Sequence, residues 1–404
     1  MYRYFFVLGE HKELSLAEVK SLLQNQGVRF EIINAPGSVL IIDTHEPLSF
    51  AFKGEERQWA FFLMRQLGGV IKLGAIEKEL DFNQLKDWAK ELTELILAKT
   101  KADKKIFFGL SLYTTAALGV NSFKLGLEIK KYLIQAGRKV RFVTSKESVL
   151  SSVVVQTNKL VSENGLEIAL VANERSVWVG VTAAVQPFAE LSKRDYGRPA
   201  RDPLSGMLPP KLAKMLINLA EAKPEEVILD PFCGSGTILT EAWLMGYQNL
   251  SGSDNDEQAI KNTRENIDWW AHEAKLAPPK IQLKRCNARQ LAKCWEKKSV
   301  NAIVTEPWLG PPLTGRESPA KINQLMGELE ELYLSTFKQF KEVLKAGGKV
   351  VIIVPAFRQK NGWLFLNIGE KIKSLGFQQA GEPLFYARED QRVGRRIFRA
   401  HLKK

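Results

Sequence analysis

A string in the middle of the chain joins an acid, two glycines and the start of a helix. Residues 227–229 are Val-Ile-Leu, which predicts a buried β-strand, and Asp230 ends it. Gly234 and Gly236 follow, and Thr237 opens an apolar helical segment. Glycines let a backbone approach a ligand closely, and the first turn of a helix has N–H groups without partners inside the helix. The string therefore predicts a nucleotide-type binding site, although a Gly-x-Gly pair also occurs in ordinary tight turns.

The residue at position 239 helps to distinguish a dinucleotide-binding motif from a SAM-binding motif. A dinucleotide-binding fingerprint has its third glycine there, and this chain has Leu239, which disfavours NAD. The whole string, D-P-F-C-G-S-G-T, resembles motif I of the class I S-adenosylmethionine (SAM) methyltransferases that act on nucleic acids. The resemblance implies that Asp230 faces the amino-acid part of SAM and that the glycines admit its ribose and sulfonium end. The expected cofactor-binding residues are Asp230, Phe232, Gly234, Gly236, Thr237, Asp254, Asn255, Asn287 and Ala288.

Two of these residues follow later predicted strands. Asp254 ends the next strand, where an acid accepts hydrogen bonds from both ribose hydroxyls of a nucleotide. The alternative is that Asp254 caps the following helix, a role that Asn255 or Asp256 could also fill. Asn287 follows the third strand, where the family often has an acid that accepts from the adenine amino group. An asparagine can accept through its amide oxygen, but it is neutral and holds adenine less firmly.

The fourth predicted strand ends in T-E-P-W-L-G, which places Glu306, Pro307 and Trp308 together. This string resembles the [Asp/Asn]-Pro-Pro-[Tyr/Phe] motif of amino-methylating enzymes. An exocyclic amine is a poor nucleophile because its lone pair is delocalised into the base. Acceptors aimed at its two N–H groups favour the pyramidal nitrogen that attacks a methyl group. The resemblance implies that the Glu306 side chain and the Pro307 carbonyl are these acceptors, that Trp308 stacks on an extruded base, and that no metal is required.

This loop departs from the motif in two ways. Glu306 stands where the motif has a shorter acid, and Trp308 stands where it has a second proline. A methylene can move an atom by about 1 Å, and a misplacement of that size can lower a rate about 10²-fold. Two alternatives therefore stay open: either the loop compensates, or the activity is weak or lost. The structural alternatives are that Glu306 only caps the strand end and that Trp308 is a core residue.

Basic residues in two regions predict contacts with a nucleic-acid backbone. One region lies between residues 124 and 146, where a solvated helix face is the alternative. The other is the Pro- and Gly-rich segment 192–213, which predicts an extended linker leading into a helix. The RNA-binding candidates are Lys130, Lys131, Arg141, Lys146, Arg194, Tyr196, Arg198 and Arg201.

The segment R-D-Y-G-R-P…G-M-L-P-P-K-L-A closely resembles one found in the archaeal-type tRNA (guanine-N2)-methyltransferases of position 10. In that family it links a THUMP module, an RNA-binding domain, to the catalytic domain. Residues 60–183 resemble a THUMP domain in the order and pattern of their predicted elements. The resemblance implies that tRNA is the partner.

Strands and helices alternate from residue 226 on, which predicts an α/β fold with a doubly wound sheet. We expect a seven-stranded Rossmann-like methyltransferase domain after an α+β ferredoxin-like and THUMP region. Earlier in the chain, Ser15 and Glu18 predict a capping box at a helix start, and Val149–Val155 reads as a strand. The expected segments are 1–60 (ferredoxin-like), 61–183 (THUMP-like), 184–208 (linker) and 209–404 (methyltransferase).

Composition narrows the class further. The net charge is +13 and the pI is about 9.4, which favours a polyanionic partner. No apolar run approaches the ~18 residues that a membrane span needs. The three cysteines, Cys233, Cys286 and Cys294, form no C-x-x-C pair. We therefore expect neither a metal site nor a disulfide framework, and a reducing cytoplasm as the compartment.

These observations favour a SAM-dependent methyltransferase that forms N2-methylguanosine, or its dimethyl form, in tRNA. An accessory protein stays an open alternative. Three other functions also stay open: an amino-methyltransferase of DNA or ribosomal RNA, an RNA-binding protein with a decayed catalytic loop, and a NAD enzyme.

Overall fold

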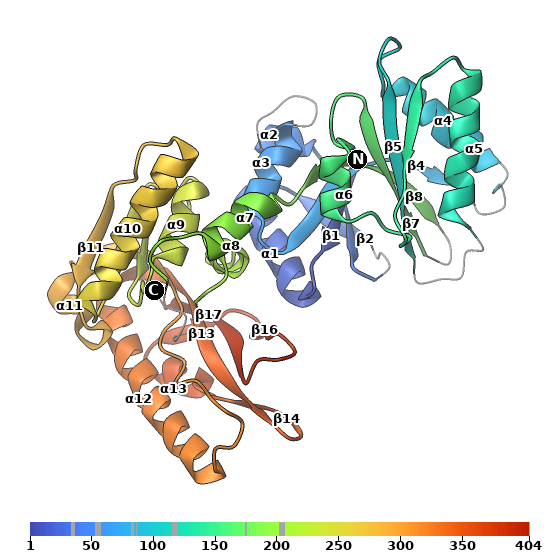
Figure 1. The fold of residues 1–404 in the computed structure, drawn as a ribbon. Helices are drawn as coiled ribbons and strands as arrows, with labels where there is room; N and C mark the ends of the chain where they lie inside the picture. The colour runs from blue at the N-terminus through green and yellow to red at the C-terminus, as the bar shows by residue number, and fades with distance from the viewer. Residues whose placement is uncertain are drawn as a thin grey trace. The chain divides into compact units, whose positions relative to one another are not determined.

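The computed structural model describes residues 1–33, 37–52, 58–81, 85, 87–114, 120–173, 176–201 and 207–403. The chain forms two compact units (Figure 1). The N-terminal unit consists of Met1–Lys12, Gln26–Arg65 and Val70–Pro187. The C-terminal unit consists of Glu13–Asn25, Gln66–Gly69 and Phe188–Lys404.

One eight-stranded sheet runs through the N-terminal unit, in the order β2-β3-β1-β4-β8-β7-β5-β6. β4 pairs antiparallel with both β1 and β8, so the predicted segments 1–60 and 61–183 share one sheet. Helices α4 and α5 pack against strands β5, β7 and β8 through one hydrophobic cluster. The elements are β1 (Tyr2–Leu8), β2 (Phe30–Ile33), β3 (Val39–Thr44), α2 (Leu48–Ala51), α3 (Gln58–Gln66), β4 (Val70–Leu80), α4 (Trp88–Ala98), β5 (Ile106–Thr114), α5 (Ser122–Gln135), β6 (Val140–Val143), α6 (Ser152–Thr157), β7 (Gly165–Ala172) and β8 (Val177–Val185).

The predicted strand Val149–Val155 is wrong. Most of it lies in helix α6, which Ser151 caps by accepting a hydrogen bond from the Val154 N–H at 3.2 Å. A run of β-branched residues favours a strand, but the serine cap and the burial of Val155 in a small apolar cluster favour the helix here.

The predicted capping box is also wrong, because α1 (Lys12–Asn25) starts earlier and places Ser15 and Glu18 inside the helix. Glu18 belongs to the C-terminal unit and is fully buried. Its carboxylate accepts from the backbone N–H groups of Gly68–Gly69, at 2.7 and 2.8 Å, and from Asn218 Nδ2 at 2.9 Å. Burial raises the pKa of Glu18 to about 7, against the effect of these donors. The carboxylate thus ties α1 and residues 66–69 to α8 within this unit.

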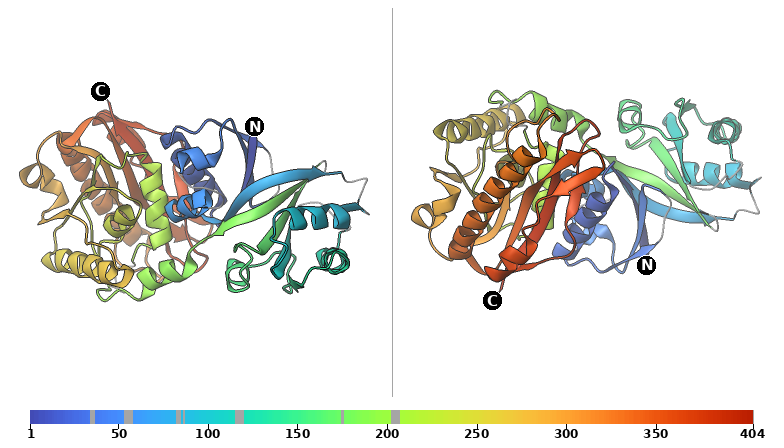
Figure 2. Two further views of the ribbon diagram at one scale, coloured as in Figure 1. Left: turned by 90° about the horizontal axis from the view of Figure 1, so that it is seen from above. Right: turned by 90° about the horizontal axis from the view of Figure 1, so that it is seen from below.

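The C-terminal unit has its main sheet in the order β11-β10-β9-β12-β13-β17-β15, with β14 on β13 and β16 on β17. This seven-stranded path confirms the predicted fold class. Strands β9 to β13 run parallel, and β17 is antiparallel to β13. One hydrophobic cluster packs α8, α9 and α10 on the sheet and a second packs α11, α12 and α13 on it (Figure 2). A doubly wound sheet binds ligands at the carboxyl ends of its strands, where the strand order reverses, here between β9 and β12.

The bounds of the remaining elements are α7 (Phe188–Tyr196), α8 (Pro210–Leu219), β9 (Val227–Asp230), α9 (Thr237–Leu244), β10 (Asn249–Asp254), α10 (Glu257–Ala274), β11 (Ile281–Arg285), the 3-10 helix η2 (Ala288–Gln290), α11 (Leu291–Cys294), β12 (Val300–Thr305), α12 (Pro319–Val343), β13 (Leu344–Gln359), β14 (Gly362–Phe365), α13 (Gly369–Ser374), β15 (Phe377–Gln379), β16 (Leu384–Tyr386) and β17 (Val393–Leu402).

The predicted linker 184–208 is not extended throughout, because helix α7 occupies part of it. Residues 202–206 of the linker lie outside the described residues. None of the helices in the described part of the chain has both the length and the apolar character needed to span a membrane.

Candidate active site

A cleft of ≈ 520 Å³ lies in the C-terminal unit, at the carboxyl ends of β9, β10 and β12. It is lined by the three catalytic candidates and by eight of the nine cofactor candidates; Gly236 is the exception. The candidates in the lining are Asp230, Phe232, Gly234, Thr237, Asp254, Asn255, Asn287, Ala288, Glu306, Pro307 and Trp308.

The two glycines of the turn have different reasons to be glycine. Both have positive φ, +51° at Gly234 and +83° at Gly236. A Cβ on Gly236 would lie 2.8 Å from the Thr263 Cγ2, so this residue is needed for packing. A Cβ on Gly234 would have no described atom within 4 Å. Because Gly234 lines the cleft, its missing side chain leaves room for a ligand.

Asp230 is buried beneath the cleft. Its Oδ1 accepts from Thr305 Oγ1 at 2.7 Å and from the Phe232 N–H at 3.1 Å. Burial, with smaller contributions from the charges of Asp254 and Glu306, raises the pKa of Asp230 to about 7. Such a carboxylate gains by meeting a cationic ligand group, which would offset the cost of its burial.

Asp254 is not the cap of the next helix, so that alternative is wrong. The N-cap of α10 is Asp256, which accepts from the Gln258 N–H at 2.9 Å. The Asp254 carboxylate instead accepts from the Gly234 N–H and the Asp256 N–H, both at 3.0 Å. These bonds hold its side chain beside the glycine turn, on the lining of the cleft.

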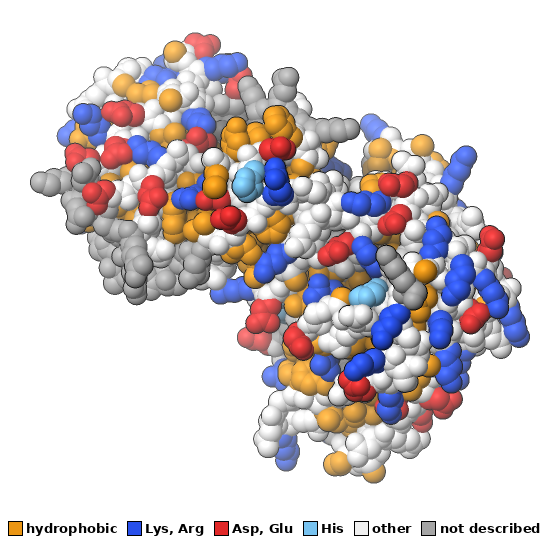
Figure 3. All heavy atoms as spheres, turned by 180° about the vertical axis from the view of Figure 1, so that it is seen from behind, with side chains coloured by type: hydrophobic (Ala, Val, Ile, Leu, Met, Phe, Trp, Pro, Cys, Tyr) orange, Lys and Arg blue, Asp and Glu red, His pale blue; other side chains and the backbone are white. Residues whose placement is uncertain are grey.

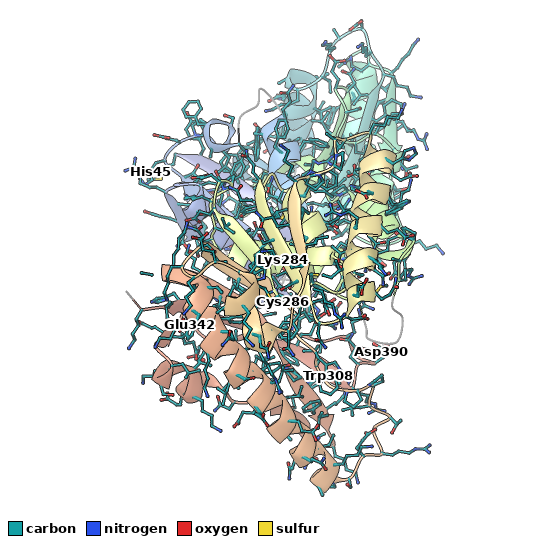
Figure 4. All side chains as sticks on the ribbon, turned by 90° about the vertical axis from the view of Figure 1, so that its left-hand side faces the viewer. His45, Lys284, Cys286, Trp308, Glu342 and Asp390 are labelled. Carbon is teal, nitrogen blue, oxygen red and sulfur yellow. A yellow bond between two sulfur atoms is a disulfide. The ribbon has the colours of Figure 1, made fainter. Side chains whose placement is uncertain are left out.

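The turn after β11 is held in two ways. Asn287 Oδ1 accepts from the Arg289 N–H at 2.9 Å and so caps η2. A disulfide joins Cys286 to Cys294 across the same turn; Cys286 is labelled in Figure 4. The expectation that no cysteines are paired is therefore wrong, and the cysteines no longer argue for a reducing compartment. The disulfide closes a short loop around Asn287 and Ala288, two residues that line the cleft.

Glu306 is held by a residue from a distant part of the sequence. Arg395, on β17, donates from Nε to Glu306 Oε1 at 2.6 Å, and the two side chains are only 6% and 13% exposed. Sequence reasoning missed Arg395 because it is one of several basic residues near the end of the chain, with no spacing that points to a partner 89 residues earlier.

Trp308 is not a core residue, so that alternative is wrong. Its side chain is 49% exposed and lines the cleft (Figure 4). Its carbonyl oxygen accepts from the hydroxyl of Tyr333, a fully buried residue of α12, at 2.8 Å. A base can stack on a half-exposed aromatic ring, and the buried tyrosine fixes the backbone that carries this ring.

The structure corrects the prediction for Arg194. This side chain is 5% exposed, and it forms a two-point ion pair with Glu241, at 2.6 and 3.0 Å. Its guanidinium also lies 4.8 Å from the ring centre of Trp270. Arg194 therefore joins α7 to α9 and α10, and it does not present its charge to an RNA phosphate.

Arg198 turns toward the cofactor turn and is 6% exposed. Its Nη1 donates to Thr237 Oγ1, whereas Nε and Nη2 are buried and have no hydrogen-bond partner among the described residues. A buried guanidinium with unsatisfied donors is costly unless an anion binds it. Arg198 lines a small cavity that shares Ser235 and Thr237 with the cleft, and its buried side chain is not exposed to an RNA backbone at the surface.

The other RNA-binding candidates lie at or near the surface. Tyr196 is 62% exposed, and the Arg201 guanidinium lies 5.9 Å from its ring centre. In the N-terminal unit Lys130 is half-buried, and the remaining three are exposed: Lys131, Arg141 and Lys146. Basic and acidic side chains are interspersed on the face seen in Figure 3. Charge alone therefore does not mark one RNA surface on that face.

Comparisons with known proteins match this chain to methyltransferases. Residues 198–362 match the RMKL-like methyltransferase domain family, and residues 61–265 match a DNA methylase family. The chain is 25% identical over 350 residues to the tRNA (guanine(10)-N2)-dimethyltransferase of Methanothermobacter thermautotrophicus, covering 86% of this chain and 87% of the relative. It is 33% identical over 144 residues to a probable tRNA (guanine(10)-N2)-dimethyltransferase of Methanothermococcus thermolithotrophicus, covering 35% of this chain and 77% of that one.

The structure of TrmN from Thermus thermophilus has the same fold, with a TM-score of 0.55, 19% identity and 99% of each chain covered. Fold, glycine turn and cleft together define a SAM-dependent methyltransferase of class I. Within that class, the chain belongs to the tRNA (guanine-N2)-methyltransferase family.

The residues of the cleft fit SAM. SAM has a cationic amino group and a carboxylate at one end and a ribose diol near its middle. Asp230 offers a buried carboxylate and Asp254 offers acceptor oxygens. The open space beside Gly234 leaves room for the ligand to lie across the turn.

Proposed function

We propose that this protein transfers a methyl group from SAM to the exocyclic N2 amine of a guanosine in tRNA. The observation that carries the proposal is one cleft that holds both the SAM-type glycine turn and the Glu306-Pro307-Trp308 loop. The two relatives described above are tRNA (guanine(10)-N2)-dimethyltransferases by name, which supports the substrate.

The carboxylate of Glu306 favours guanine over adenine. A carboxylate only accepts hydrogen bonds. The Watson–Crick edge of guanine presents the N1–H group beside the N2 amine, so both neighbours donate. The corresponding edge of adenine places an acceptor nitrogen beside its amine. An ionised Glu306 therefore attracts the guanine edge and repels the adjacent lone pair of adenine.

Four polar residues of the cleft are given roles in this proposal: Asp230, Asp254, Asn287 and Glu306. Asp230 faces the amino group of SAM. Asp254 accepts from the ribose hydroxyls, and Asn287 contacts adenine through its amide NH₂, because its oxygen already caps η2. Bound SAM supplies a methyl group activated by a sulfonium. The protein positions the amine, with Glu306 and the Pro307 carbonyl as acceptors and Trp308 as the stacking platform.

The transfer needs no metal and no reactant other than SAM and the guanosine. The N2 lone pair forms the new N–C bond, and the electrons of the C–S bond stay on sulfur, which leaves as a neutral thioether. The methylated nitrogen then loses one proton, which Glu306 accepts and passes to water. The same site could act twice to give the dimethyl form.

The tRNA itself is bound by surfaces outside the cleft. Tyr196 and Arg201 lie on the C-terminal unit, and Lys131, Arg141 and Lys146 on the THUMP-like N-terminal unit. Exposed cations of this kind contact phosphates and fix the register of an RNA without reading its sequence. A tRNA substrate makes the cytoplasm the expected place of action, which cell fractionation would test.

DNA amino-methylation is a second candidate, favoured by the match of residues 61–265 to a DNA methylase family. The chemistry of the loop is the same for either polymer.

Purified protein with labelled SAM would be offered unmodified tRNA, ribosomal RNA and DNA in parallel, and the methylated nucleosides identified by mass spectrometry. We expect N2-methylguanosine from tRNA. Methylated DNA would favour the second candidate. Tight tRNA binding without transfer to any polymer would contradict the proposal and favour a decayed site.

A further inference from the structure

We propose that Arg395 is a positioning residue for methyl transfer, which holds the Glu306 carboxylate where the guanine amine needs its acceptor. The inference rests on the proposed function. Glu306 is one methylene longer than the acid of the motif, and an arginine two strands away contacts this longer side chain.

Strand register shows how the two residues meet. β13 lies between β12 and β17, with Thr305 opposite Ile352 on one side and Pro355 opposite Arg395 on the other. Two strand spacings amount to about 9.6 Å. Neither side chain spans that distance alone, but together they cross β13 and meet at 2.6 Å. An aspartate at 306 would withdraw its oxygens by about 1.5 Å, beyond hydrogen-bond distance of the guanidinium.

Burial of the ion pair holds the Glu306 carboxylate in one orientation. With Glu306 at 13% and Arg395 at 6% exposure, water competes little for the ion pair. This hydrogen bond engages Oε1, and the proposal gives Oε2 the role of accepting from the amine. A carboxylate held on one oxygen loses the freedom to rotate away from the substrate, so the acceptor is in place before the base arrives.

The charge of Arg395 also suits the surroundings of Glu306. Asp230 and Asp254 line the same cleft, and the charge of Glu306 is among the causes that raise the pKa of Asp230. A cation against Glu306 offsets one of three neighbouring negative charges. The negative charge that remains lets the cleft admit cationic SAM.

The test compares Arg395→Ala and Arg395→Lys with Arg396→Ala, a neighbouring arginine of β17 that stacks on Phe365. For each variant, kcat and KM would be measured with tRNA, and the Kd for SAM by calorimetry. We expect Arg395→Ala to lower kcat about 10²-fold while KM and the Kd for SAM change less than about twofold. Arg396→Ala should keep the kcat of the unaltered protein.

Chemical rescue separates positioning from a general structural role. Added guanidinium ion should restore part of the kcat of Arg395→Ala, because the ion can occupy the vacated place beside Glu306. It should not restore Glu306→Ala. Glu306→Asp should lose activity to a similar extent, and combining it with Arg395→Ala should cost little more, because both changes break the same contact.

Three results would overturn the inference: kcat of Arg395→Ala within twofold of the unaltered protein, a loss shared equally by SAM binding, or additive losses in the double variant. If Arg395→Ala does not fold, Arg395→Lys decides, with reduced kcat and unchanged SAM binding expected. An unaltered protein that methylates no nucleic acid overturns the proposed function and this inference together. A protein that methylates tRNA but ignores Arg395 overturns only the inference.

Discussion

The two halves of the cleft are built in different ways. In the cofactor half, Asp230, Gly234 and Thr237 come from one strand, turn and helix that are contiguous in sequence. In the substrate half, Glu306 is held by a residue 89 positions away, and the Trp308 carbonyl by one 25 positions away. A contiguous strand, turn and helix thus form most of one half, with Thr305 as a long-range partner of Asp230, whereas single long-range side-chain contacts hold the catalytic loop of the other.

This difference has consequences for substitution. Many parts of the cofactor half are backbone N–H groups, which no side-chain change removes. In the substrate half, the Glu306 acceptor and the Trp308 platform each depend on one side chain. Substitutions in the substrate half should therefore lower the rate of transfer while SAM still binds.

The largest expected effect is that of Glu306→Ala. Loss of a preorganised acceptor at the reacting group should lower kcat about 10²- to 10³-fold, with the Kd for SAM nearly unchanged. The matched control is Glu342→Ala, a half-buried glutamate of α12 that pairs with Lys297 (Figure 4) and should keep full activity when it is replaced. Equal loss in both variants, or none in either, would contradict the role of Glu306.

The next effect is that of Trp308→Ala. A stacked base contributes about 1–3 kcal/mol, so kcat/KM for tRNA should fall roughly 5- to 150-fold. Trp308→Phe keeps a ring and should retain most of the activity, and SAM should bind both variants as before. Steady-state kinetics on tRNA would measure this. An alanine variant as active as the unaltered protein would rule out stacking.

The cofactor half should respond to pH. Because the pKa of Asp230 lies at about 7 without ligand, the carboxylate is charged above that pH and attracts the cationic end of SAM. Below it, binding must first release a proton, so the Kd for SAM should rise by up to about tenfold per pH unit as the pH falls below 7. Calorimetry across this range would measure the slope. Asp230→Asn should remove it, and an unchanged slope in that variant would contradict the assignment.

The smallest expected effect is that of Tyr333→Phe. The change removes the hydroxyl that donates to the Trp308 carbonyl, which costs about 1 kcal/mol, or roughly fivefold in kcat/KM for tRNA. SAM binding should not change, because Tyr333 touches only the substrate half through this bond. A loss of SAM affinity would show that the two halves are coupled.

The parts of the fold that depend on local patterns were predictable. Alternating apolar strands and amphipathic helices predicted the doubly wound sheet, and the Asp230-to-Thr237 string predicted the turn that now lines the cleft. Val149–Val155 was mispredicted because strand propensity competes there with a serine cap and a buried helical contact.

The features that could not be predicted from the sequence depend on contacts between residues far apart in the chain. Arg194 belongs to a basic run, and only the fold shows that Glu241, 47 residues later, buries and neutralises it. Arg395 and Tyr333 carry no local motif at all, and they become visible only when the sheet and α12 bring them to the catalytic loop. The disulfide between Cys286 and Cys294 likewise has no spacing signature.

The most direct test asks which atom of the base receives the methyl group. The methylated guanosine of a tRNA transcript would be mapped by mass spectrometry and then replaced by inosine, which lacks the exocyclic amine and keeps the rest of the base. The account predicts full transfer to the guanosine transcript and none at the inosine. Transfer that continues at the inosine would place the methyl on another atom and would contradict the role assigned to Glu306 and its loop.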